Sequence, residues 1–275
     1  MYDEKNYNYW GEYFLKTLDT FIEKLYIKEN SILLLTENSL TLLMAMKQIG
    51  GMSQYNIDEL FDILLDKLIK KLGDKGTLLI QTFDWRFCNN KIYDIRKSKS
   101  RTSFLGNIAL KRDNFIRTKH PIYSFAVTGK YKNELANLDN KGSFDKNSPF
   151  YFLYEKKAKM MIIDISLQKS FTFAHFVEEM EQVHYRYNKS FTSKYIDELG
   201  IENLKTYDLY VRNLDNNVLT YLEPLENLFT KYGAMNKYMM NELVIREVDL
   251  YKAYHIIEDD IRNNDAKSLY RIGKK

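Results

Sequence analysis

The sequence predicts an α/β protein, a single domain in which a mixed or mainly parallel central sheet is flanked by helices. Short apolar runs at 31–36, 76–82 and 159–165 have the length and composition of buried strands. Between the first two, residues 58–72 carry apolar side chains at helical spacing, and Gly73 follows the last of them. A strand, a helix and a second strand in this order predict a parallel crossover, the repeating unit of α/β folds.

The other elements before residue 118 follow from the same spacing. Residues 7–28 mix aromatic and aliphatic side chains at intervals of three and four, which predicts an amphipathic helix. Residues 40–46 predict a short helix that ends at Gly50 and Gly51. Residues 83–117 are polar and irregular, a long connection of the kind that often carries function.

Beyond that connection, residues 120–129 predict a strand and residues 130–138 a short helix. After the third buried strand we expect a helix that contains His175. A side chain in that place lies where open α/β sheets bind their ligands.

The last third of the chain has a weaker pattern. Residues 218–228 and 237–263 have helical spacing, and Pro224 predicts a bend or a break in the first of these stretches. We therefore expect residues 196–275 to form a helical C-terminal extension of a domain that spans residues 1–275.

Composition excludes several classes of protein. The net charge is only +4, with 41 basic and 37 acidic residues, so the surface lacks the charge of a nucleic-acid-binding protein. Its basic clusters, at 67–71 and 96–101, are short. No run of 18 apolar residues exists and the N-terminus is polar, so neither a membrane span nor a signal peptide is expected. Cys88 is the only cysteine, which excludes an internal disulfide and favours a reducing cytoplasm.

The most informative string is Thr172-x-x-His175-x-x-Glu178, because the chain has only four histidines. On a helix, residues three apart share one face, so the carboxylate can orient the imidazole as a general base. A carboxylate so placed is expected to raise the pKa of the histidine. A chance pair on a helix surface is the alternative reading. The histidines offer no metal-ligand spacing, so no metal is expected.

Further strings precede this one in a fixed order: Gly76-Thr77-Leu78, Arg117-x-x-His120-Pro121-x-x-Ser124-Phe125-Ala126-x-x-Gly129, and Ser148-Pro149. With the aromatic and basic segment 184–189, they resemble the aminoglycoside 3-N-acetyltransferase family over about residues 30–195. This coenzyme A-dependent family lacks the common GNAT acetyltransferase fold. The resemblance implies a cytoplasmic enzyme that transfers an acyl group from acetyl-coenzyme A, or another acyl-coenzyme A, to a small-molecule amine.

The resemblance also implies roles for individual residues. His175 would be the general base and Glu178 its orienting partner. Side chains expected near the coenzyme are Ser39, Thr77, Thr82, Arg117 and Ser124, although such residues also serve at strand ends, in turns and in salt bridges. Asp94, His120 and Glu179 are candidates for the acceptor site; surface acids, and a packed structural imidazole at His120, are the alternatives.

The sequence departs from the family's pattern on the coenzyme side. Where the family has a His-Ser-Ser string, this chain has Thr36-Glu37-Asn38-Ser39, and an acidic residue there is unexpected beside a coenzyme arm. Gln81 replaces a proline, and Asp164 replaces a glycine after the third strand. The catalytic string is kept while these details change, which suggests retained chemistry with an altered acceptor.

Three readings of function remain open. The acceptor is an aminoglycoside-like amine, as in antibiotic modification, or an amino-sugar nucleotide of surface-glycan synthesis. The basic segment 96–112 slightly favours the second, although it could equally serve the 3′-phosphate of coenzyme A. Alternatively the chain is a degenerate binding protein without catalysis, as Glu37 and Asn38 would allow. The aromatic N-terminal helix and the C-terminal helices could also form a homodimer face, although apolar stripes more often belong to a core.

Overall fold

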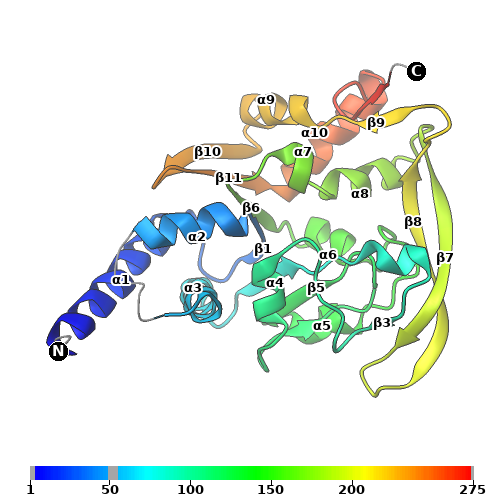
Figure 1. The fold of residues 1–275 in the computed structure, drawn as a ribbon. Helices are drawn as coiled ribbons and strands as arrows, with labels where there is room; N and C mark the ends of the chain where they lie inside the picture. The colour runs from blue at the N-terminus through cyan, green and yellow to red at the C-terminus, as the bar shows by residue number, and fades with distance from the viewer. Residues whose placement is uncertain (1–3, 49–54, 274–275) are drawn as a thin grey trace.

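A seven-stranded sheet lies at the centre of the structure, a computed structural model that describes residues 4–48 and 55–273 (Figure 1). Its strands lie in the order β10 (Met235–Met240), β11 (Leu243–Asp249), β6 (Lys159–Ile163), β1 (Ile32–Glu37), β2 (Thr77–Gln81), β5 (Phe125–Gly129) and β4 (Ile116–Arg117). β1 pairs in parallel with β2 and β6, and the other neighbours pair antiparallel. The sheet is therefore mixed, and the predicted α/β class is confirmed.

Each face of this sheet covers its own hydrophobic core, because successive side chains of a strand point to opposite faces. Leu34, Leu79 and Met160 belong to one core, and Leu33 and Leu35 to the other. The first core is closed by α6 (Pro149–Glu155), α8 (Phe173–Met180) and α10 (Leu250–Asn263). The second is closed by α1 (Glu4–Lys24), α2 (Ser39–Gln48), α3 (Ile57–Leu72) and α4 (Phe104–Ala109). Helices thus flank both faces (Figure 1).

The predicted crossover is present between β1 and β2, whose register aligns Ile32 with Thr77. α3 begins at Asn56, whose side chain accepts from the backbone N–H of Glu59 while the Glu59 carboxylate accepts from that of Asn56. It ends at Gly73, which adopts a positive φ of 71°. The predicted strands, crossover helix and His175 helix are all confirmed, whereas Gly50 and Gly51 lie outside the described residues.

The long connection after β2 is less irregular than expected. It contains η2 (Trp85–Asn89) and β3 (Tyr93–Asp94) before α4 and β4. After β5 come the predicted short helix, α5 (Lys132–Asn137), and later α7 (Leu167–Ser170), which precedes α8. Among the described residues, no helix is long and apolar enough to span a bilayer.

The predicted helical extension at 196–275 is wrong, because this region contains more strand than helix. β7 (Arg186–Ile196) and β8 (Glu202–Arg212) make a long hairpin that joins β3 in a separate sheet. β9 (Val218–Thr220) pairs with β12 (Tyr270–Ile272), and α9 (Glu223–Lys231) and α10 are the only helices described beyond residue 195. Pro224 lies in the first turn of α9, where a proline fits, rather than at a bend.

The sequence did not indicate the hairpin of β10 and β11, because its turn lacks the usual glycine. Asn241 and Glu242 both adopt positive φ, 48° and 65°, in a two-residue turn that Asn-Gly usually occupies. Without a glycine the apolar residues on either side looked continuous and helical. Pairing of β11 with β6 supplies the strand conformation that local spacing did not indicate.

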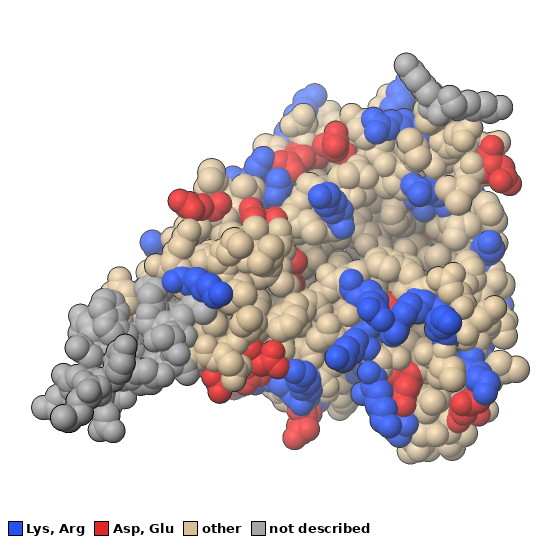
Figure 2. Space-filling model, in the orientation of Figure 1, with Lys and Arg blue, Asp and Glu red and all other residues tan. Residues whose placement is uncertain are grey.

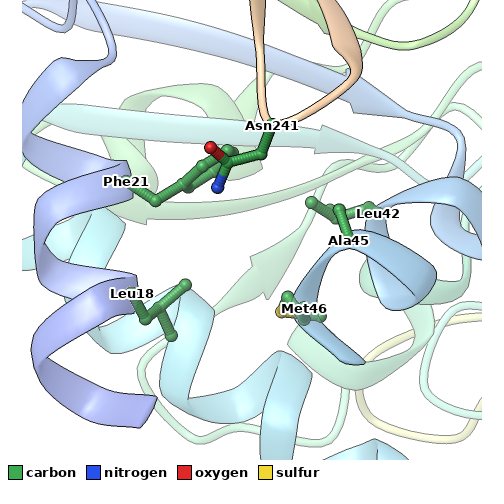
Figure 3. A pocket seen from close by; sticks show the side chains of 6 residues that line it. All are labelled: Leu18, Phe21, Leu42, Ala45, Met46 and Asn241. Carbon is green, nitrogen blue, oxygen red and sulfur yellow. The ribbon is translucent and has the colours of Figure 1, made fainter. Parts of the chain in front are cut away.

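A small apolar cavity lies between α1, α2 and this turn (Figure 3). The described residues that line it are Leu18, Phe21, Leu42, Ala45, Met46 and Asn241. Its volume of about 10 Å³ is no larger than a water molecule needs, so it is a packing gap and not a ligand site.

Two glycines give a test of the backbone packing. Gly129 has a φ of 97°, and a Cβ there would lie 2.1 Å from the carbonyl oxygen of Gly76, whereas nothing lies within 4 Å of a Cβ at Gly233, whose φ is 67°. Gly129→Ala should lower the free energy of unfolding by at least about 3 kcal/mol, and Gly233→Ala by about 1–2 kcal/mol. Urea denaturation measures both, and equal losses would contradict the packing at the β2–β5 edge.

Candidate active site

The topology predicts a ligand crevice at the carboxyl ends of β1 and β6. These strands are parallel neighbours, but the chain leaves β1 into α2 on one face of the sheet and leaves β6 toward α8 on the other face. Such a switch point is where open α/β sheets bind ligands. His175, on α8, and Ser39, the first residue of α2, therefore belong to the elements that border this crevice.

The predicted pair is formed. Nδ1 of His175 lies 2.6 Å from Oε2 of Glu178, whose side chain is completely buried. The His175 side chain is 18% exposed, and its Nε2 has no hydrogen-bond partner in the described part of the chain. Because a carboxylate can only accept, Nδ1–H donates to it and Nε2 keeps a free lone pair.

Glu178 is fixed by two further residues that the sequence analysis left without a role. The hydroxyl of Tyr185 donates to Oε1 at 2.9 Å, and Nε of Arg186 lies 2.7 Å from Oε2. Both residues belong to the aromatic and basic segment noted above, at the start of β7. Its tyrosine and arginine were the available signal, but only the fold brings them to α8.

The charges of this group hold His175 neutral. Burial alone would raise the pKa of Glu178, but Arg186 and His175 outweigh it and keep that pKa below its usual value. Burial lowers the pKa of His175, and the positive charge of Arg186 lowers it further, against the opposing effect of Glu178. Glu178 raises this pKa as expected, but burial and the positive charge of Arg186 outweigh it, so the pKa of His175 lies below its ordinary value. A neutral imidazole with a fixed tautomer is suited to accept a proton at neutral pH.

A second pair with the same spacing shows why the string alone is weak evidence. On α10, Nδ1 of His255 lies 2.9 Å from Oε2 of Glu258. The histidine side chain is 43% exposed, and its carboxylate pairs at 2.9 Å with Arg262 of the same helix, which is 59% exposed, rather than with a tyrosine and an arginine of a strand. Burial and the two clamping residues distinguish the His175 pair.

An acidic group lies one turn further along α8. Glu179 is buried, and its Oε2 has no hydrogen-bond partner among the residues described. Burial and the negative charges of Asp145 and Asp208 raise its pKa to about 7. Residues four apart share a helix face, so this negative potential lies on the side of His175.

Glu37 ends β1 with its carboxyl group turned toward two helix starts. Oε1 accepts hydrogen bonds from the hydroxyls of Ser39, at 2.8 Å, and Ser103, at 3.0 Å. Its Oε2 is buried without a partner in the described residues, as is Nε2 of Gln81 on the neighbouring strand. Burial raises the pKa of Glu37 to about 7, although the hydroxyls and the backbone N–H of Leu105 oppose this.

Three predicted coenzyme residues instead form a closed buried network. The hydroxyls of Thr82 and Ser124 lie 2.9 Å apart, and Arg117 donates from Nε to Ser124 at 3.0 Å and from Nη2 to the carbonyl of Thr82 at 2.7 Å. Arg117 also donates to the carbonyl of Ser98 and stacks on the ring of Tyr93. The network fastens the long connection to β2 and β5.

The structure places the remaining candidates apart from His175. Thr77 lies at the opposite end of β2, where its hydroxyl accepts from the backbone N–H of Tyr131. Asp94 pairs with Arg96 at 3.0 Å, and β3 joins the far end of β7, about 30 Å along that strand from Arg186.

His120 is completely buried, and burial lowers its pKa to about 3. Its Nδ1 accepts from the backbone N–H of Tyr123 at 3.2 Å, and its ring packs on Tyr207. This is the packed structural imidazole that the sequence analysis held as the alternative.

The face drawn in Figure 2 is hollowed between α8 and the segment that carries β3. Lys and Arg side chains gather at the β3 side of this hollow. The segment after β3 supplies four exposed basic residues, Arg96, Lys97, Lys99 and Arg101. Among the residues described, no three His, Cys, Asp or Glu side chains converge as they would around a metal ion.

A buried acid–imidazole pair with a free nitrogen, at the switch point of an α/β sheet, is the arrangement that a general base requires. The chain belongs to the aminoglycoside 3-N-acetyltransferase family, whose model matches residues 44–260. The resemblance stated from the sequence is thereby confirmed, and with it the class of enzyme, an N-acetyltransferase. No curated protein matches the chain.

Solved structures share the fold at low identity. AAC-VIa bound to sisomicin is 13% identical, with a TM-score of 0.72 over 91% of this chain and 97% of that one. The YokD protein from Bacillus subtilis is 16% identical, with a TM-score of 0.70 over 92% and 94%. AAC-IIIb in a binary complex with CoASH is 13% identical, with a TM-score of 0.69 over 88% and 93%.

The buried Glu37 predicts a pH-dependent stability. Its pKa of about 7 lies above the ordinary 4.5, so the folded state holds the proton more tightly. The contribution of Glu37 to the free energy of unfolding is complete below pH 4.5 and is lost as the pH rises through 7. The loss between pH 5 and 8 is about 2–3 kcal/mol. Glu37→Gln should remove this loss when urea denaturation is compared at the two pH values. Exposed Glu198→Gln is the control, and parallel curves for wild type and Glu37→Gln would refute the assignment.

Arg186 provides a test of the electrostatics around the base. Arg186→Gln should raise the pKa of His175, because a positive charge that opposes protonation is lost. It should also lower the free energy of unfolding by about 3 kcal/mol, since buried Glu178 loses a partner. NMR titration of the imidazole signals measures the first effect. Arg262→Gln, which removes a partner of Glu181 at the end of the same helix, should leave the His175 signal in place.

Proposed function

We propose that this protein transfers an acetyl group from acetyl-coenzyme A to an amine of an aminoglycoside-like acceptor in the cytoplasm, with His175 as the general base. The observation that carries the proposal is the free Nε2 of a neutral imidazole whose other nitrogen is held by buried Glu178. Family membership supplies the class of reaction, and the charges around His175 supply the direction of proton transfer.

His175 would accept one proton from the amine and return it to the leaving sulfur. An acyl thioester supplies the carbonyl carbon. Nε2 of His175 takes a proton from the attacking amine as the N–C bond forms, and Glu178 stabilises the resulting imidazolium. As the C–S bond breaks, Nε2 returns the proton to the leaving sulfur, which gives an amide and a free thiol.

Glu179 supports a cationic acceptor. With Asp145 and Asp208 it places negative potential on the face of α8 that carries His175. An amine binds mainly as an ammonium ion, to which Glu179 offers an oxygen that has no partner in the described chain, and it gives one proton to solvent before it attacks. We therefore assign Glu179 to acceptor binding.

The crevice at β1 and β6 suits the amide-containing arm of coenzyme A. Nε2 of Gln81 is a donor without a partner in the described chain, on the sheet face that α8 covers, and an amide carbonyl of the arm can accept from it. The carboxyl group of Glu37, by contrast, lies on the opposite face with Ser39 and Ser103. Ser39 borders the same crevice. We leave Thr77, Thr82, Arg117, Ser124, Asp94 and His120 outside the proposed site, because each is buried in other contacts or lies away from His175.

The test is a thiol-release assay with acetyl-coenzyme A against a panel of aminoglycosides and amino-sugar nucleotides. His175→Ala should lower kcat/KM by about 10²–10⁴-fold, and Glu178→Gln should also lower it, because the imidazole loses its fixed tautomer. His255→Ala is the matched control, since it removes the exposed pair with the same spacing.

Turnover of sugar nucleotides alone would select the glycan-synthesis acceptor. Absence of turnover, with no calorimetric binding of coenzyme A, would leave the degenerate binding-protein reading. Full activity of His175→Ala would refute the assigned base.

A further inference from the structure

Two arginines face each other across the β7–β8 hairpin. Arg186 and Arg212 are directly opposite in the antiparallel register, so their side chains leave the same face of the hairpin. Arg186 already has partners: it forms an ion pair with Glu178, and its Nη1 and Nη2 donate to the carbonyl of Tyr210 and the hydroxyl of Thr220, each at 3.2 Å, although its Nε makes no hydrogen bond within the described chain. That face is the one turned toward α8.

Arg212 has no such partners. Its side chain is partly buried, yet it makes no hydrogen bond, ion pair or ring contact with any of the residues described. It lies close enough to His175 for its positive charge to act on the imidazole. A guanidinium withdrawn from water without a counter-charge is unfavourable, and a carboxylate or phosphate matches its planar fork.

Both negatively and positively charged side chains thus surround His175. Glu179, with Asp145 and Asp208 behind it, offers a negative group one turn from the base. Arg212 offers a positive group on the hairpin side, and the positive charge of Arg186 is already matched by Glu178. A purely cationic acceptor would use the first group and be repelled by the second.

We propose that Arg212 binds an anionic group, a phosphate or a carboxylate, that the acceptor carries beside its amine. The inference rests on the proposed acyl transfer to an amine but changes the preferred acceptor from a purely cationic aminoglycoside to a zwitterionic amine, with its ammonium on the Glu179 side and its anion on Arg212. Bidentate charge-assisted hydrogen bonds from the guanidinium would fix which amine faces His175.

The experiment uses two acceptors that differ only in a phosphate, glucosamine and glucosamine 6-phosphate. In the wild type, KM for the phosphorylated amine should be at least about 10-fold lower. Arg212→Gln should bring the ratio of the two KM values close to one, and Arg212→Lys should restore part of it. Lys205→Gln is the matched control, because it removes a positive charge from the same strand about 20 Å away, where Lys205 lies over the ring of Tyr195.

Other outcomes identify other sources of the anion and overturn the proposal. A rise in KM for acetyl-coenzyme A alone in Arg212→Gln would assign the guanidinium to a coenzyme phosphate. An equal fall in kcat for both acceptors, with KM unchanged, would assign it to the reacting carbonyl.

Calorimetry separates this inference from the proposed function. Binding of glucosamine 6-phosphate that is lost in Arg212→Gln and retained in Lys205→Gln would support the anion site even without turnover. Equal binding to wild type and both variants would refute it. Thermal unfolding monitors folding of each variant, and Arg212→Lys carries the test if Arg212→Gln does not fold.

Discussion

The buried carboxylate of Glu178 is the interaction on which the rest of the site depends. A carboxylate with no exposed surface is strongly unfavourable unless charges and donors surround it, and here an arginine, a tyrosine and a histidine do so. Those partners come from α8 and from the start of β7, so the ion pair ties the helix after β6 to a hairpin that lies outside the central sheet. The same contacts orient the imidazole. Its position is therefore as fixed as the packing of α8 against the β7–β8 hairpin.

In this arrangement Glu178 orients the imidazole of His175 without a net rise in the pKa of the imidazole. A lone carboxylate would orient the ring and raise its pKa, because it fixes Nδ1–H and also stabilises the imidazolium. Arg186 neutralises the second effect without disturbing the first, since it shares Oε2 of Glu178 with the histidine. Burial acts in the same direction as the arginine, and the net pKa of His175 falls. His175 is thus neutral and keeps a carboxylate beside it, which is what the proposed general base requires.

The sequence predicted those parts of the molecule whose signal is local. The strands at 32–37, 77–81 and 159–163 and the helix of His175 follow from continuous apolar runs and helical spacing. The β10–β11 hairpin was missed because its turn has no glycine and because β11 pairs with a strand that is distant in the sequence. Val244, for example, donates a hydrogen bond to Asp164, 80 residues earlier. The site divides in the same way. His175 and Glu178 share one turn of helix, whereas Arg186 and Arg212 reach it only through strand register, and Thr82 and Ser124 were already occupied by Arg117.

The departures from the family's pattern gain a physical meaning once they are placed in the fold. Asp164 adopts a φ of 53°, a left-handed conformation that explains why a glycine suits this position and why aspartate is tolerated there. Glu37 fills the crevice end of β1 with a carboxyl group whose pKa of about 7 lets it donate a hydrogen bond when protonated and only accept when ionised. The change therefore alters the polarity at the carboxyl end of β1 while His175, Glu178 and Arg186 remain in contact with one another.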